Sequence, residues 1–97
     1  MGVYVVAVLK FTNEQRYRRY QRKFAEVFAK FHGQLLCADE HPFPLEGKWF
    51  GDKIVLMSFD NEAEAQTFFQ SAEYSEISKD RKAGTETMSV LAQALEQ

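Results

Sequence analysis

The segment Val3-Tyr-Val-Val-Ala-Val-Leu-Lys-Phe11 sets the architecture of this chain. It is dense in β-branched and aromatic residues, a composition that predicts a β-strand. Successive side chains of a strand point to opposite faces. One face therefore carries Val3, Val5, Ala7, Leu9 and Phe11, and the other carries Tyr4, Val6, Val8 and Lys10. Because both faces are largely apolar, we expect both to be covered in the native protein.

Length and composition describe a small, apolar domain. The 97 residues predict a single domain over positions 1–97, large enough for one modest core. Apolar residues make up 45% of the chain and aromatic residues 14%, so the aromatic side chains need more buried surface than one small core offers. The formal net charge is −2, and no net positive field therefore attracts nucleic acid or an anionic membrane.

A helical pattern follows the first strand. Its apolar residues recur on an arc of roughly 100°, and they are Tyr17, Tyr20, Phe24, Val27, Phe28 and Phe31. Thr12, with Gln15 three residues further on, has the form of a capping box. Gly33 suits the left-handed position just after a helix. We therefore predict a helix that begins after Thr12 and stops at Gly33.

Further strand patterns cover residues 34–40, 53–59 and 85–95. With the first strand and two helices, they give the order βαββαβ. This order predicts an α+β, ferredoxin-like fold, in which a four-stranded antiparallel sheet has its helices on one face.

Capping residues divide the second helical region. Asn61, with Glu64 at the third helical position, predicts the start of one helix. Ser71 is placed to cap a further segment that ends at Gly84, and Arg81 shares the inner face of that segment with Tyr74 and Ile77.

The uncovered sheet face predicts a second copy of the chain. Helices on one side leave the other bare, yet the first and third strands are apolar on both faces. A lone monomer would expose more apolar surface than the few hundred Å² usual for soluble monomers. We therefore predict a homodimer in which two copies stack their open sheet faces.

The loop Leu45-Glu-Gly-Lys-Trp-Phe-Gly51 joins the second and third strands. A plain hairpin turn needs only glycine, asparagine or aspartate, whereas this loop carries the only tryptophan and a carboxylate. Glu46 and Trp49 have two interpretations. They form the wall of a ligand pocket, or the indole plugs the sheet edge while the carboxylate caps amides of its own loop.

With these residues in place, the chain resembles a bacterial family called domain of unknown function thirteen-thirty, in the dimeric α+β barrel superfamily. The resemblance rests on the helix with Tyr17, Tyr20 and Phe24, on Leu-Glu-Gly-x-Trp at 45–49, on 71–74 and on Arg81. It implies a dimeric α+β barrel over nearly the whole chain. It implies no reaction, since the superfamily includes cofactor-free monooxygenases as well as ligand-sensing domains.

Five residues are candidates for binding a ligand in a cleft beside the 45–51 loop: Glu46, Trp49, Arg81, Tyr17 and Tyr20. An arginine on an inner helix face needs a carboxylate if it is buried. Glu46 and the carboxylate of a ligand are the two alternatives. Tyr17 and Tyr20 belong to the helical core stripe, with hydroxyls that reach its rim.

His41 and Glu46 are the candidate catalytic residues. An imidazole next to the loop can act as a general base near neutral pH. The alternative for His41, which precedes Pro42 on a connector, is a solvated side chain without a role.

The sequence indicates no metal and no cofactor. The two histidines are nine residues apart, which matches neither helical nor strand ligand spacing. The single cysteine, Cys37, excludes an intramolecular disulfide and an iron–sulfur cluster held by one chain. The third strand lacks the aromatic platform of RNA-recognition domains, so we expect no nucleic acid partner.

No apolar run approaches the roughly 18 residues of a membrane span, and the N-terminal segment lacks a signal-peptide pattern. We therefore expect no membrane partner and a cytoplasmic location. Two functions remain. The first is binding, or conversion without a cofactor, of a small anionic or aromatic molecule. The alternative is a non-catalytic dimer whose loop residues only anchor the structure.

Overall fold

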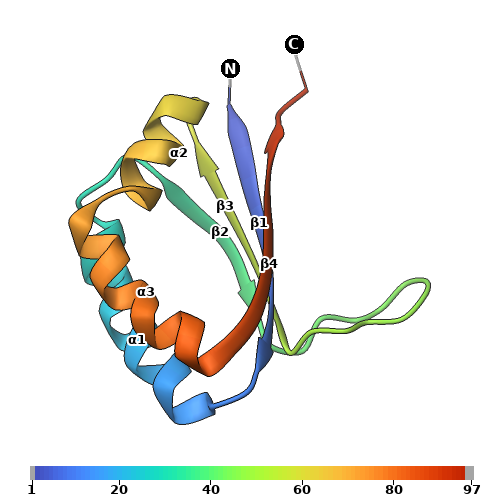
Figure 1. Cartoon of the computed structure of the whole chain (residues 1–97). Helices are drawn as coiled ribbons and strands as arrows, with labels where there is room; N and C mark the ends of the chain where they lie inside the picture. The colour runs from blue at the N-terminus through green and yellow to red at the C-terminus, as the bar shows by residue number, and fades with distance from the viewer. Residues whose placement is uncertain (1, 96–97) are drawn as a thin grey trace.

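The computed structural model describes residues 2–95. Its elements are β1 (Val3–Phe11), α1 (Glu14–Phe28), β2 (Gln34–Asp39), β3 (Lys53–Phe59), α2 (Glu62–Phe69), α3 (Ala72–Gly84) and β4 (Thr85–Gln93). The strands form one antiparallel sheet in the order β2-β3-β1-β4, and the three helices lie on one face of it (Figure 1). The predicted ferredoxin-like fold is confirmed. Within residues 2–95, no helix has the length and apolar character needed to cross a membrane.

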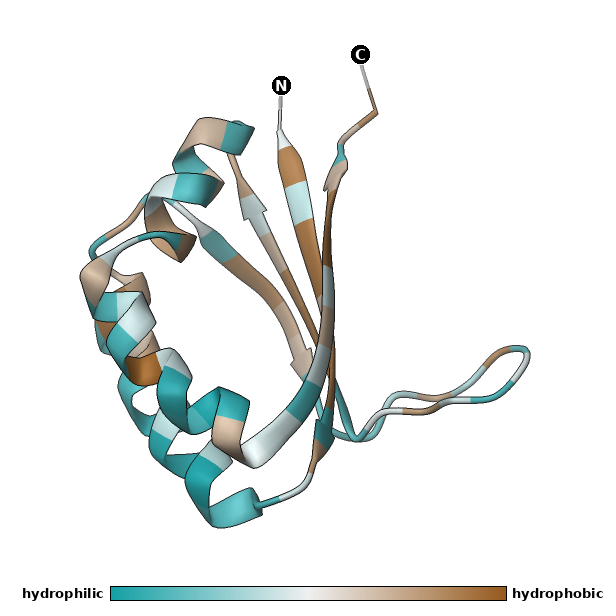
Figure 2. Cartoon of the chain, in the orientation of Figure 1, coloured by the Kyte–Doolittle hydropathy of each residue, from teal (hydrophilic) through white to brown (hydrophobic). Residues whose placement is uncertain are grey.

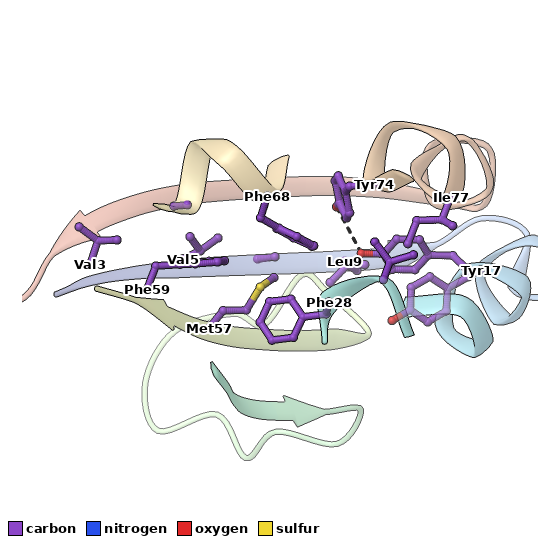
Figure 3. Close-up of a cluster of buried hydrophobic side chains, with 14 residues drawn as sticks. Val3, Val5, Leu9, Tyr17, Phe28, Met57, Phe59, Phe68, Tyr74 and Ile77 are labelled. Carbon is purple, nitrogen blue, oxygen red and sulfur yellow. Dashed lines mark hydrogen bonds between the residues drawn. The ribbon is translucent and has the colours of Figure 1, made fainter. Parts of the chain in front are cut away.

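The helix-covered face of the sheet holds the core. Val3, Val5 and Leu9 of β1 are buried on this face, as are Met57 and Phe59 of β3. The side chains of α2, α1 and α3 meet them from above (Figure 3). Phe68 of α2 is fully buried. Its ring lies 5.1 Å from Phe28 of α1, 5.9 Å from Phe59 of β3 and 4.6 Å from Tyr74 of α3, measured between centroids. It therefore joins aromatic side chains of the sheet to those of both other helices.

Side-chain caps fix the start of each helix. The Asn61 side chain accepts a hydrogen bond from Glu64 N at 2.8 Å, and Ser71 Oγ accepts one from Tyr74 N at 3.1 Å, as predicted. The prediction for α1 was wrong by one residue. The cap is Asn13, whose Oδ1 accepts from Arg16 N at 3.2 Å, whereas Thr12 N donates to Gly84 O. Both residues are good cap types, so their backbone conformation decided between them.

The predicted role of Gly33 was also wrong. Helix α1 ends at Phe28, with Ala29 as its C-cap, and Gly33 does not adopt a left-handed conformation. A Cβ atom at Gly33 would lie 2.6 Å from the Phe59 ring and 2.7 Å from the Phe28 ring. The position therefore needs glycine because two aromatic rings pack against its backbone.

The other face of the sheet is apolar and, within residues 2–95, no helix covers it, although Gly51 lies against Val8 at one end of it. Met88 and Val90 of β4 are 63% and 54% exposed, and Tyr4 of β1 is also exposed. Val6, Val8, Ile54 and Leu56 lie between them and are half-buried. We call this surface the outer face. Figure 2 shows apolar residues along the strands, whereas the solvent side of the helices is largely polar.

The segment 41–51, which we call the arm, projects from the sheet on the side away from the helices (Figure 1). It has no helix or strand of its own. Gly47, near its tip, has a φ of 78°, a left-handed value that glycine tolerates without strain.

Candidate functional site

A cavity of about 260 Å³ lies between the sheet and the helices. We call it the central cavity. Its floor is formed by side chains of all four strands, and its roof by the tyrosines and Phe24 of α1, Phe69 of α2, and Tyr74 and Arg81 of α3. The walls are mainly apolar, with a small set of polar groups among them. That composition is typical of pockets that bind small molecules.

The roof of the cavity is held together by contacts between α1 and α3. The close backbone contacts of α1 are mainly with α3, whereas the helix–sheet contacts join mainly α2 to β3 and α3 to β4. Tyr20 of α1 and Tyr74 of α3 connect the two helices through a hydrogen bond between their hydroxyls, at 3.2 Å. Phe68 fills the space under α2, and the space under the α1–α3 pair is left partly empty.

Lys53, the first residue of β3, places an amine at the cavity. Its side chain shares the helix-covered face with Val55 and Met57, and the residue is only 4% exposed. The Nζ atom lies 5.1 Å from the centroid of the Tyr17 ring, within the range of a cation–π interaction. It lies 3.6 Å from Glu40 Oε2, which is an ion-pair distance but too long for a hydrogen bond. The ammonium therefore keeps donors for another partner.

Glu40 is held mainly by Arg18 of α1. Arg18 donates from Nη1 to Oε2 at 2.6 Å and from Nη2 to Oε1 at 2.8 Å, in a two-bond geometry. This guanidinium lowers the pKa of the Glu40 carboxyl from 4.5 to about 2, with a smaller effect from Lys53. Since Arg18 and Glu40 satisfy each other, Glu40 neutralises at most part of the Lys53 charge.

Arg81 is the second cation of the cavity. Its Nε atom is buried and has no hydrogen-bond partner, and within residues 2–95 the side chain forms no ion pair. A buried polar atom without a partner costs roughly 1–3 kcal/mol, and more when the group is charged. The cavity thus presents two cations, and neither is hydrogen-bonded to a carboxylate.

Hydroxyl groups complete the polar lining. Burial raises the pKa of Tyr20, so its hydroxyl stays protonated and can donate. Thr85 Oγ1 donates to the carbonyl of Arg81 at 2.8 Å and lies 2.6 Å from Thr87 Oγ1. Because the only hydroxyl proton of Thr85 is used by Arg81, Thr87 must donate to Thr85. The Thr87 oxygen, which lines the cavity, is then an acceptor for a ligand.

One mouth of the cavity lies between α1 and the edge strand β2. Gln21 and Ala25 of α1 and Leu35 and Ala38 of β2 both line the cavity and are exposed to solvent. The β2–β3 register shifts between Leu35 and Cys37, so β2 carries a bulge beside this mouth.

The residues predicted from the sequence divide into two groups. Tyr17, Tyr20 and Arg81 line the central cavity. Glu46, Trp49 and His41 belong to the arm and are not part of the cavity lining. The central cavity lies between the sheet and the helices. The arm leaves the sheet on the side away from the helices (Figure 1).

Two roles proposed for the arm residues also change. Glu46 forms no ion pair with Arg81, so the structural pair between them is absent from the described residues. The backbone N–H of His41 donates to Asp39 Oδ1 at 2.8 Å, and its side chain is exposed.

Sequence reasoning missed Lys53, Glu40 and Arg18. A signal was present for Lys53, because it stands on the face of β3 that is otherwise apolar, in register with Val55, Met57 and Phe59. No such signal exists for Glu40, which follows β2 directly and meets Arg18 and Lys53 only in the folded chain.

The fold and this cavity define a ferredoxin-like α+β domain with a ligand-sized space between its sheet and its helices. The chain belongs to the family described as Domain of unknown function (DUF1330), whose profile matches residues 2–95. The resemblance stated from the sequence is thereby confirmed. A comparison with curated proteins found no match.

Similar solved structures share the fold. One is a protein of unknown function from Rhodopseudomonas palustris, with a TM-score of 0.82 and 15% identity over 99% of this chain and 84% of that chain. Another is SnoaB, a cofactor-independent oxygenase from Streptomyces nogalater, with a TM-score of 0.71 and 10% identity over 99% and 95% of the two chains. A dimeric ferredoxin-like protein of unknown function from Thermobifida fusca has a TM-score of 0.68 and 11% identity over 96% and 92%. At these identities the likeness establishes the fold alone.

Proposed function

We propose that this protein binds a small anionic molecule with an apolar or aromatic body in the central cavity. The observation that carries the proposal is Arg81, whose buried Nε lacks a partner in a mainly apolar space. A ligand carboxylate or similar anion would supply the missing acceptor. It would also use the donors of Lys53 that Glu40, at 3.6 Å, leaves free, so that binding gives the buried Arg81 Nε a partner and brings an anion between the two cations.

The cavity restricts the size and shape of the ligand. Its volume of about 260 Å³ lies just below the roughly 300–1,000 Å³ of pockets for drug-sized molecules. This favours a compound of about one aromatic ring. Phe24 and Tyr17 of α1 and Val55 of β3 offer apolar and aromatic surface for its body. The hydroxyl groups of Tyr20 and Thr87 offer polar contacts for a further substituent.

The proposal is tested by titration calorimetry with matched pairs of one-ring probes. Benzoate, salicylate and phenylacetate are compared with benzamide and benzyl alcohol, which have similar shape and no charge. We expect the anions to bind and the neutral probes to bind at least about tenfold more weakly, because a charge-assisted hydrogen bond contributes roughly 1.5–3 kcal/mol. Equal binding of benzoate and benzamide, or no binding by any anion at millimolar concentration, would overturn the proposal.

Substitutions locate the binding site. Arg81→Gln and Lys53→Met each remove one cation from the cavity and are expected to weaken anion binding about 10- to 100-fold. Arg19→Gln is the matched control, since Arg19 is an exposed cation of α1 outside the cavity lining. If Arg19→Gln weakens binding as much as Arg81→Gln, the ligand sits on the outside of the helices and not in the cavity.

We further propose that the protein is a homodimer in which two copies stack their outer faces. The contiguous apolar side chains of β1, β3 and β4 support this, as does the existence of a dimeric structure of the same fold. Stacked sheets lie about 10 Å apart. Sedimentation equilibrium from about 1 to 100 µM is expected to give twice the 11.2 kDa chain mass. A single 11.2 kDa species over that range would exclude the dimer.

A further inference from the structure

The arm is attached firmly at its base. Asp52, which follows it, donates its backbone N–H to Leu9 O at 2.7 Å, and its Oδ2 accepts from Phe11 N at 2.8 Å. Both bonds fix the end of the arm to β1. The start follows β2 directly, where Asp39 Oδ1 accepts from His41 N. The direction in which the arm leaves the sheet is therefore set by two strands.

Beyond this base, the arm presents large apolar side chains to solvent. Phe43 is 85% exposed, Leu45 94% and Phe50 77%. Three such residues within eight positions are costly to leave in water, since full burial of one of them is worth roughly 1.5–3 kcal/mol. Pro42 and Pro44 reduce the conformational freedom of the same segment, so less entropy is lost when it packs against a partner.

The length and direction of the arm suggest what covers these side chains. The arm leaves the sheet on the side of the outer face (Figure 1). Six extended residues from position 41 to 46 span at most roughly 20 Å. A second sheet stacked on the outer face would lie only about 10 Å away. An arm of this length is therefore long enough to reach the plane of a stacked sheet and to pass it.

We propose that the arm clasps a second copy of this chain, and that Phe43, Leu45 and Phe50 pack against that copy beyond the stacked sheets. This inference rests on the proposed homodimer and adds a distinct contact to it. Two-fold symmetry makes the contact reciprocal, since each copy contributes one arm and receives another. The arm then serves dimerisation and is not a wall of the central cavity.

The triple variant Phe43→Ser, Leu45→Ser, Phe50→Ser tests the arm while leaving the outer face intact. Its matched control is Glu46→Ser, Lys48→Ser, which changes exposed polar residues of the same arm. The dimer dissociation constant is measured by sedimentation for both variants and for the wild type. We expect the dimer dissociation constant of the triple variant to be at least about 100-fold higher than that of the wild type, because a few well-buried residues carry most of the binding energy of an interface. The dissociation constant of the control variant should stay within about threefold of the wild-type value.

Trp49 provides an independent readout, because it is the only tryptophan and belongs to the arm. When the wild type is diluted to concentrations below its dimer dissociation constant, the arm should become exposed. The tryptophan emission should then shift to longer wavelength, and quenching by acrylamide should increase. The arm contact alone is overturned if the wild type is a dimer, the triple variant has the same dissociation constant, and dilution leaves the Trp49 emission unchanged. A monomeric wild type overturns the dimer itself. Anion binding in the central cavity, measured in the same variants, should not change in either case.

Discussion

Val5 and Val6 are neighbours in β1, yet their environments differ completely. Val5 is buried under the helices, whereas Val6 is half-buried on the outer face. The same difference applies to the sheet as a whole. On one side, Phe68 and the tyrosines of α1 and α3 enclose a core with a cavity and two cations. On the other, the apolar side chains of the outer face and of the arm beyond its base are largely exposed within residues 2–95. One face is thus completed by the chain itself, and the other is suited to a second molecule.

The largest expected effect comes from placing the same charge on each face. Val5→Asp buries an unpaired carboxylate in the core and should destabilise the fold by at least about 4 kcal/mol, which is most of the stability of a small domain. Val6→Asp should leave the fold intact and convert the dimer into a monomer. Circular dichroism and light scattering measure both outcomes. If Val6→Asp unfolds the chain, or if it remains a dimer, the proposed use of the outer face is wrong.

An intermediate effect is expected at Glu40, which anchors the polar end of the covered face. Its pKa is about 2 in the folded state and near 4.5 without Arg18. The stabilisation is therefore complete above pH 4.5 and is lost as the pH falls from 4.5 towards 2. Glu40→Gln should lower the free energy of unfolding by about 1–2 kcal/mol at pH 7. The difference in this free energy from the wild type should shrink as the pH falls from 4.5 towards 2.

The control for Glu40 is Glu14→Gln, because Glu14 also contacts Arg18, at 3.3 Å, as an exposed i, i+4 pair. Such pairs contribute only about 0.3–0.5 kcal/mol. Chemical denaturation at a series of pH values gives the difference in free energy of unfolding between each of the two variants and the wild type. If Glu40→Gln lowers the stability by the same amount at every pH down to 2, packing of the Glu40 side chain, and not its ion pair, accounts for the stabilisation.

The smallest expected effect is at Arg81. Since its Nε has no partner, replacing the guanidinium by an apolar chain of similar length removes a cost as well as packing contacts. Arg81→Met should therefore change the free energy of unfolding by less than about 1 kcal/mol, while it weakens anion binding about 10- to 100-fold. Thermal denaturation without ligand measures the first effect. A loss above about 2 kcal/mol would mean that Arg81 serves the fold, which is the alternative raised by the sequence.

Much of the fold could be predicted because it is encoded locally. Alternating apolar residues identified the strands, and cap residues placed the starts of α2 and α3 at Asn61 and Ser71. The same periodicity assigned Tyr17, Tyr20 and Arg81 to inner helix faces, and these are the predicted ligand-binding residues that line the central cavity. Their positions followed from helical spacing, which relates residues only a few positions apart.

The tertiary structure decided what depends on residues far apart in the chain. Glu40 meets Arg18 and Lys53 across three elements, and Gly33 is required by the rings of Phe28 and Phe59. The arm has no periodicity, so its sequence carried no information about the side of the sheet from which it leaves. Periodicity tells which face of its own element a residue occupies. The distance between packed elements, and therefore the cavity, is set by side chains that meet only after folding.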